Sequence, residues 1–149
     1  MNDEYFMNQA IALAKEAAEE GEVPVGAVVV LDGKIVGAGR NRREISKNAL
    51  AHAEIEAINE ACRALGGWRL WQCDMYVTLE PCPMCTGAII NSRIKRLVYG
   101  ASDYKAGSCG SVIDLFSLPY NHKPEVAKGV MQEECAALLT DFFKKLRKK

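Results

Sequence analysis

Hydrophobic and polar positions along this chain fall into blocks with two different periods, which predict helices and short strands in turn. From Asp3 to Glu20 apolar residues recur at helical spacing and Gly21 ends the run, as expected for an amphipathic helix. The same period predicts further helices over residues 51–65, 81–91 and 132–147, and a short one over 111–116. Apolar, β-branched runs predict strands over residues 25–31, 34–41, 75–79, 96–99 and 125–130.

The order of these elements predicts the fold class. Asp32-Gly33 lies between the first two strands and is a strong signal for a β-hairpin turn, while the polar residues 42–50 are expected to form a loop. After the hairpin, helices alternate with strands, which is typical of an α/β protein. We therefore expect a three-layer α/β/α sandwich around a mixed five-stranded sheet, with residues 1–149 forming one domain.

Composition indicates a soluble protein without a membrane partner. The 149 residues are 49% hydrophobic and 26% charged, close to the usual balance of globular domains. No apolar stretch reaches the roughly 20 residues of a membrane span. The acidic N-terminal segment Met1–Glu4 lacks the layout of a secretory signal, so we expect a cytoplasmic protein.

Charge is balanced overall but unevenly distributed. The net charge is +0, which neither favours nor excludes a nucleic-acid partner. Basic residues gather in two places: Arg40, Arg42, Arg43 and Lys47, and then Lys144, Lys145, Arg147, Lys148 and Lys149. Such clusters can form a local positive surface for nucleic acid. On charge alone they are equally compatible with solvated loops and helix ends.

Cysteine and histidine positions indicate a metal site. Without a signal peptide, the six cysteines do not predict a disulfide framework. Cys82 and Cys85 form a CxxC pair at the start of one predicted helix, and His52 lies at the start of another. Two thiolates and one neutral imidazole balance Zn²⁺ and leave one tetrahedral position for water, which is the arrangement of catalytic rather than structural zinc.

Glu54 follows two residues after His52 and completes the motif. Zinc lowers the pKa of a bound water, and a nearby carboxylate can take the water's proton and deliver it to the substrate. The order His-x-Glu…Pro-Cys-x-x-Cys is the signature of zinc-dependent nucleobase deaminases. A redox CxxC pair would leave His52 and Glu54 unexplained. A structural zinc would need a fourth ligand, for which only isolated candidates remain: Cys62, Cys73, Cys109, Cys135 and His122.

Beyond this motif, much of the sequence resembles the bacterial tRNA-specific adenosine deaminases of the cytidine deaminase superfamily. The segments that carry the resemblance are Glu22–Ala27, Ala51–Ile55, Thr78–Cys85, Asp103–Gly107 and Glu134–Phe143. The resemblance implies a cytidine deaminase-like fold, one Zn²⁺ per subunit, and a homodimer that binds the tRNA anticodon arm. It also implies hydrolytic deamination of the wobble adenosine, at the first anticodon position, to inosine.

The resemblance further implies a set of contacts around the target nucleotide. Asn41 would hydrogen-bond the adenine, Ala53 would lie against it, and Glu80 would help to shape the pocket. Asp103 and Lys105 would contact the adjacent ribose and phosphates. From the residues alone, Asn41 could equally end a strand, and Asp103 is an ordinary turn residue.

More distant contacts to the anticodon loop are implied for Asn121, His122, Phe142 and Phe143. Aromatic side chains beside cations suit single-stranded RNA, because they combine stacking with phosphate neutralisation. Without the resemblance, His122 would be a solvated loop histidine and both phenylalanines would be core residues. Tyr104 departs from the resemblance, which implies a smaller residue at that position.

Two other functions fit part of this pattern. A free-base or nucleotide deaminase acting on guanine or cytosine would share the zinc motif but would not need a basic, aromatic C-terminal helix. A non-catalytic nucleic-acid-binding module with structural zinc would keep the metal, and Glu54 would be dispensable.

Overall fold

Helices and strands lie close to where the hydrophobic pattern predicts them. The computed structural model describes residues 2–148; Met1 and Lys149, the ends of the expected domain, lie outside the described residues. The helices are α1 (Asp3–Glu19), α2 (Arg43–Ser46), α3 (Ala53–Leu65), α4 (Pro83–Ser92) and α5 (Gln132–Arg147), with a 3-10 turn η1 (Leu115–Ser117). The strands are β1 (Gly26–Leu31), β2 (Lys34–Arg40), β3 (Asp74–Leu79), β4 (Arg96–Ala101) and β5 (Glu125–Lys128).

The strands form one mixed five-stranded sheet in the order β2-β1-β3-β4-β5, as expected. β1 is antiparallel to both β2 and β3, whereas β3, β4 and β5 run parallel. The predicted hairpin joins β1 to β2, with φ of 50° at Asp32 and 78° at Gly33. Positive φ at both turn residues is what a type I′ turn requires, and glycine adopts it without strain.

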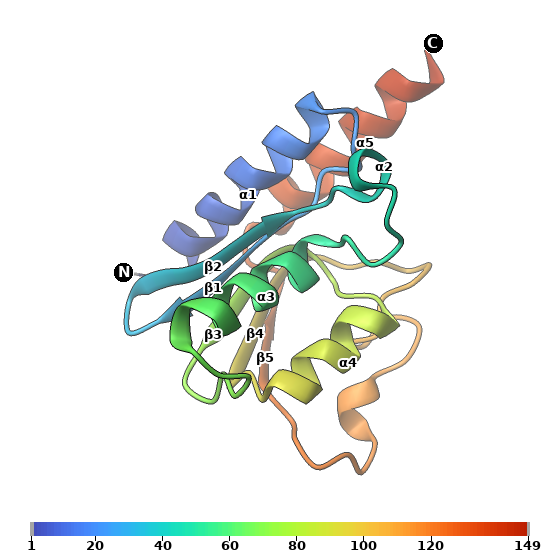
Figure 1. The fold of residues 1–149 in the computed structure, drawn as a ribbon. Helices are drawn as coiled ribbons and strands as arrows, with labels where there is room; N and C mark the ends of the chain where they lie inside the picture. Colours follow the sequence, from blue (N-terminus) through green and yellow to red (C-terminus); the bar gives the residue numbers. More distant parts are fainter. Residues whose placement is uncertain (1, 149) are drawn as a thin grey trace.

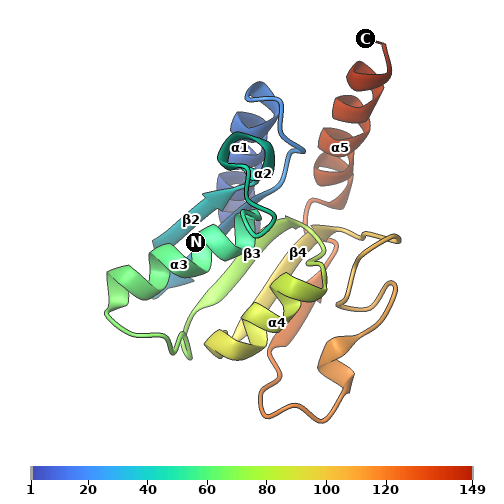
Figure 2. The same ribbon diagram turned by 45° about the vertical axis from the view of Figure 1, so that its right-hand side comes forward.

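Helices cover both faces of the sheet, which confirms the three-layer α/β/α sandwich (Figures 1 and 2). Alternate residues of β1 divide between the two cores. Ala27 and Val29 pack with α3 and α4, while Val28 and Val30 pack with α1 and α5. Because both faces of the central strands are buried, their sequences are continuously apolar rather than alternating.

Glycines in β2 bring α3 unusually close to the sheet. A β-carbon on Gly37 would collide with the backbone of Ala57, and one on Gly39 would collide with the backbone of Ala53. This approach fixes the first turn of α3 against the end of β2.

Two local expectations are wrong. Residues 42–50 contain the short helix α2, because the buried carboxylate of Glu22 accepts hydrogen bonds from the backbone N–H groups of Glu44 and Ile45. The helix expected over residues 111–116 is reduced to η1. Asp114 accepts a hydrogen bond from the backbone N–H of Phe116 and begins the turn there, after an isolated β-bridge to Cys109.

Strand directions explain where the chain gathers its polar residues. β2 and β3 are both antiparallel to β1 and therefore run the same way, and β4 is parallel to β3. The C-terminal ends of these three strands thus share one edge of the sheet, and Asn41, Glu80 and Ser102 follow directly after them. This edge is where open α/β sheets bind ligands. Among the described residues, no helix has the length and apolar character needed to cross a membrane.

Candidate active site

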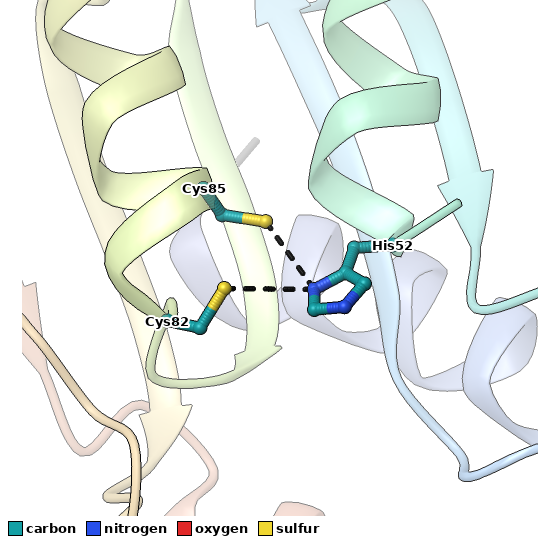
Figure 3. A group of neighbouring side chains, drawn as sticks. All are labelled: His52, Cys82 and Cys85. Atoms are coloured by element: carbon teal, nitrogen blue, oxygen red, sulfur yellow. Dashed lines mark hydrogen bonds between the residues drawn. The ribbon is translucent and has the colours of Figure 1, made fainter. Parts of the chain in front are cut away.

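Three side chains with metal-binding atoms meet where the N-termini of α3 and α4 face each other (Figure 3). His52 immediately precedes α3, Cys82 immediately precedes α4, and Cys85 lies in the first turn of α4. The Nδ1 atom of His52 is 3.6 Å from the Sγ atom of Cys82 and 3.6 Å from that of Cys85. All three atoms lie within 4.8 Å of one another.

The spacing of these atoms fits a tetrahedral zinc ion. Zn–N bonds of about 2.05 Å and Zn–S bonds of about 2.3 Å at a tetrahedral angle separate nitrogen from sulfur by about 3.6 Å. That is the separation of His52 from each cysteine. The two nitrogen–sulfur separations in this chain therefore match those of a tetrahedral zinc site.

Electrostatics at the start of α4 favour a thiolate. A hydrogen bond from Cys85, together with one from His52, lowers the pKa of Cys82 to about 4, against the opposing effect of burial. The pKa of Cys85 is raised because it shares its proton with Cys82 and is buried. The Cys82 sulfur in turn raises the pKa of His52. The helix N-terminus adds a further preference for negative sulfur at this point.

A fourth protein ligand does not join this group. Within residues 2–148, His52, Cys82 and Cys85 are the one cluster of three or more potential ligands. Burial raises the pKa of the other cysteine thiols, to about 11 for Cys73 and about 12 for Cys109 and Cys135, so these remain protonated. An incomplete ligand set is typical of a catalytic site with a position for water.

Glu54 lies in the first turn of α3 and is only 4% exposed. Its carboxyl group is not among the clustered ligand atoms but is close enough to Cys85 to affect the pKa of that thiol. Burial raises the pKa of Glu54 to about 7. A buried carboxyl group beside the ligand cluster is placed to accept and donate a proton, as a general acid–base catalyst must.

A pocket of about 500 Å³ opens above these residues and is lined by His52, Ala53, Glu54 and Cys82. Asn41 contributes to its wall and is almost fully buried. The Asn41 Nδ2 group donates to the Val23 carbonyl at 3.2 Å, and its Oδ1 atom accepts from the Arg43 N–H at 3.3 Å. One amide hydrogen and one oxygen lone pair remain for a ligand.

Glu80 also lies in the pocket wall, but the protein's own loop engages its carboxylate. Its Oε1 atom accepts from the backbone N–H of Asp103 at 3.0 Å and from the Ser111 hydroxyl at 2.5 Å. Its Oε2 atom accepts from the N–H groups of Cys109 and Ser111. Burial alone would raise the pKa of Glu80, yet these hydrogen bonds lower it below its usual value. Glu80 therefore holds the loop that follows β4.

Asp103 and Lys105 line the pocket on that loop. The Asp103 carboxylate accepts hydrogen bonds from the backbone N–H groups of Lys105 and Ala106, so Asp103 builds the turn as well as facing the pocket. Phe143 reaches the pocket from α5, whereas Phe142 is half-buried beside it and is not among the lining residues.

Asn121 and His122 do not reach the pocket. The His122 Nε2 atom lies 2.6 Å from the carbonyl oxygen of Ile94, just before the N-terminal end of β4. The pocket lies at the opposite end of that strand, beyond Ala101. Contacts from these two residues to RNA stay a prediction.

Several lining residues were not proposed as site residues from the sequence, although Arg43 was noted in a basic group and Tyr104 in the loop expected to contact RNA: Val23, Val25, Arg43, Leu79, Ser102, Tyr104, Ala106 and Leu139. Most follow or precede a strand at the same sheet edge, so the topology would have identified them once the strand directions were known. Leu139 carried its own signal, since it lies four residues before Phe143 on the same helical face.

Comparison with known proteins shows the family of this chain. Residues 1–147 match the model of the MafB19-like deaminase family. A tRNA-specific adenosine deaminase from Bacillus subtilis is 50% identical over 148 residues, covering 99% of this chain and 92% of that protein. One from Haemophilus influenzae is 48% identical, covering 97% and 85%.

Solved structures of deaminases are similar to this chain in both fold and sequence. A structure from a study of A-to-I editing by tRNA:A34 deaminases at the wobble position of transfer RNA has a TM-score of 0.88 and 47% identity, covering 91% of this chain and 99% of that one. A guanine deaminase from Bacillus subtilis has a TM-score of 0.68 and 34% identity, covering 100% and 96%. These likenesses confirm the cytidine deaminase-like fold. The chain belongs to the deaminase family that includes the tRNA-specific adenosine deaminases.

Proposed function

We propose that this protein hydrolyses the wobble adenosine of a tRNA anticodon loop to inosine, releasing ammonia. The observation that carries the proposal is the pairing of a three-ligand metal geometry with a buried glutamate at the base of one pocket. Identity of 50% with a tRNA-specific adenosine deaminase supports tRNA as the substrate class. A tRNA substrate also agrees with a cytoplasmic location.

His52, Cys82 and Cys85 would hold one Zn²⁺ per subunit, with nitrogen and sulfur donors at the separations that this ion requires. Bound zinc would supply a water that ionises near neutral pH. Burial raises the pKa of the Glu54 carboxyl group in the metal-free protein. A nearby cation would lower that pKa and favour the carboxylate, which can accept the proton of the water.

Glu54 would carry the proton through the reaction. It takes a proton from the water that attacks C6 of adenine and delivers it to a ring nitrogen. The second proton of the water would then pass from the C6 hydroxyl to the amino group, the C6–N bond would break, ammonia would leave, and C6 would keep the oxygen as a carbonyl. Water is consumed, ammonia is released and no redox partner is needed. Burial of Glu54 keeps bulk water from exchanging this proton.

The pocket would take one extruded base. A volume of about 500 Å³ accommodates a nucleobase but not a folded stem, so the adenosine must leave the loop stack to react. Asn41 would hydrogen-bond the base with its remaining donor and acceptor, and Ala53 would pack against it. Asp103 and Lys105 would contact the adjoining ribose and phosphate, and Phe143 would stack on a loop nucleotide.

Three residues expected to contact RNA do not line this pocket and would have to contact the RNA elsewhere. Phe142, with the cations of α5, would grip the anticodon loop outside the pocket. Asn121 and His122 lie towards the N-terminal end of β4, at the opposite end of that strand from the pocket, and would contact a loop bound to the partner protomer of a homodimer. Lys149, the last of the basic run, lies outside the described residues.

The surface of α4 supports a homodimer. This helix is PMCTGAIINS, without a charged residue, although one face looks away from the sheet. Surface helices normally carry charged or polar residues along the face turned to solvent, whereas within α4 only Pro83 and Asn91 are exposed. The half-buried Met84, Gly87 and Ala88 would be covered by a second copy of the chain. Sedimentation of the purified protein tests this directly, and a monomer at micromolar concentration would contradict it.

Guanine deamination is the second candidate, because the similarity to a guanine deaminase spans this entire chain. A substrate panel separates the two. Zinc-loaded protein is incubated with an anticodon stem-loop bearing a wobble adenosine, with free guanine and with free cytosine, and both inosine and ammonia are measured. We expect inosine from RNA alone. Ammonia from a free base without inosine would overturn the tRNA assignment.

A further inference from the structure

Tyr104 is the most exposed large apolar side chain among the described residues, at 81%. It belongs to the loop after β4, between Asp103 and Lys105, and it lines the mouth of the pocket whose base is formed by His52 and Glu54. The tRNA-deaminase assignment gives it no role. A tyrosine so exposed at the entrance of a site is a candidate for contacting the substrate that enters it.

The backbone beneath Tyr104 is held firmly despite this exposure. The Asp103 N–H donates to Glu80, and the Asp103 carboxylate accepts from the N–H groups of Lys105 and Ala106. The Gly107 N–H donates to the Asp103 carbonyl at 2.8 Å. A ring on a fixed loop loses little backbone entropy when a ligand stacks on it, so the loop is preorganised as a platform.

The surroundings of Tyr104 suit a nucleotide next to the target. Arg43 and Lys105 bring cations to the same pocket and Phe143 brings a second aromatic ring. When an adenosine is extruded, the neighbouring base loses its stacking partner. An aromatic side chain at the pocket mouth can replace that lost contact, and does so best for the bases that stack most strongly.

We propose that Tyr104 stacks on the base of one nucleotide flanking the target adenosine and so helps to determine which sequence contexts are deaminated. The proposal rests on the RNA deaminase function proposed above. Purines offer a larger stacking face than pyrimidines, so a purine at the stacked position should be preferred through Tyr104.

The test is a double-mutant cycle on RNA. Native protein, Tyr104→Ala and Tyr104→Phe are assayed with stem-loops in which the nucleotide before or after the wobble adenosine is intact or abasic. Trp71→Ala serves as a control, because Trp71 is an exposed aromatic before β3, at the opposite end of the sheet. KM for inosine formation and RNA binding by fluorescence anisotropy are both measured.

We expect Tyr104→Ala to raise KM and Kd about 5- to 100-fold on intact RNA, with little change in kcat. Tyr104→Phe and Trp71→Ala should stay within about twofold of native, since each leaves the stacking ring in place. An abasic nucleotide on one side should abolish the difference between native and Tyr104→Ala. Equal KM values on intact RNA, or a penalty that persists with both abasic RNAs, would overturn the stacking role while leaving the deaminase function standing. Absence of inosine from the native protein would overturn both.

Discussion

Individual residues at this site divide between those that face the pocket and those that hold its walls. His52, Cys82 and Cys85 present ligand atoms at zinc separations, and Glu54 is buried beside them. Glu80 is equally buried, yet both of its oxygens accept hydrogen bonds from the protein. We therefore expect substitution of Glu54 to affect the chemistry, and substitution of Glu80 to affect the stability of the loop after β4.

Replacing Cys82 with serine should weaken zinc binding more than about 100-fold. Losing a hydrogen-bond partner of a metal ligand already costs up to about 100-fold, and losing a ligand itself should cost more. Serine cannot supply the thiolate that the lowered pKa of Cys82 indicates. Zinc content after competition with a chelator measures the effect. Cys62→Ser is the matched control, because Cys62 is outside the ligand cluster, and it should keep its zinc. Equal retention by both variants would contradict the ligand assignment.

Glu80→Gln should lower the free energy of unfolding by about 1–3 kcal/mol, because an amide N–H group would then face a backbone N–H donor. The loop carrying Asp103 and Lys105 would loosen, so KM for RNA should rise more than kcat falls. Denaturant unfolding and steady-state kinetics measure the two effects. Ser111→Ala, which removes one of the four hydrogen bonds, should have a smaller effect on both. A large loss of kcat with unchanged KM would instead indicate that Glu80 takes part in the chemistry.

Sequence reasoning could group His52, Cys82, Cys85 and Glu54 into one candidate site, because the two motifs that carry them have short spacings at helix starts. It could not assign the task of Glu80, whose partners lie 23 to 31 residues further along the chain. The same limit applies to Glu22, which stabilises α2 from 22 and 23 residues away. Contacts of this kind become visible only when the strand directions bring the loops to one edge.

At the scale of elements, the site depends on how closely α3 approaches β2. Gly39 lies against the backbone of Ala53, the first residue of α3 and the neighbour of both His52 and Glu54. The hydrophobic pattern predicted both elements to within two residues at each end. It could not predict their separation, because a glycine in a strand indicates a close approach without saying to what.

Gly39→Ala should destabilise the protein by about 1–3 kcal/mol, since the added methyl group overpacks the contact with α3. Zinc affinity should fall as well, because the first turn of α3 positions His52. Denaturant unfolding and zinc competition measure these effects. Gly67→Ala is the control: a β-carbon there would have no heavy atom within 4 Å. If Gly39→Ala matched Gly67→Ala in both measurements, the close approach would not position the ligand.

A second contact between elements ties α1 to the sheet and should make stability depend on pH. Asp3 accepts hydrogen bonds from Arg96 at 2.8 and 2.7 Å, and from the Tyr76 hydroxyl at 2.7 Å. The Arg96 hydrogen bonds are the main cause that lowers the pKa of Asp3, with burial opposing them. A carboxylate with a lowered pKa stabilises the fold above its ordinary pKa, and the stabilisation disappears as pH falls through the folded value.

Asp3→Asn should therefore be less stable than the native protein at pH 7, and the difference should shrink as pH falls below the ordinary pKa of aspartate and through the lowered folded value. Urea unfolding at several pH values tests this. Glu4→Gln, an exposed substitution in the same first turn, should show a much smaller difference at pH 7. A constant gap between native and Asp3→Asn at all pH values would argue against an ionic contribution.

At the scale of the whole molecule, topology joins distant motifs into one site. Loops after β2, β3 and β4 meet at one sheet edge, the N-termini of α3 and α4 face each other there, and α5 contributes Phe143 (Figures 1 and 3). The fold class and the clustering of His52, Cys82 and Cys85 could be predicted from sequence, since both follow from local pattern and spacing. The placement of Asn121 and His122 away from the pocket could not, because it depends on the return of the chain to β5.

The most direct test of the central claim is inosine formation by the zinc-loaded native protein and its Glu54→Gln variant on an anticodon stem-loop with a wobble adenosine. We predict inosine from the native protein and a kcat lower by about 10²–10⁴-fold in Glu54→Gln, with zinc content unchanged. Equal inosine formation by the two proteins would contradict the role of Glu54, and zinc binding without inosine from either would contradict the whole account and favour a non-catalytic nucleic-acid-binding role.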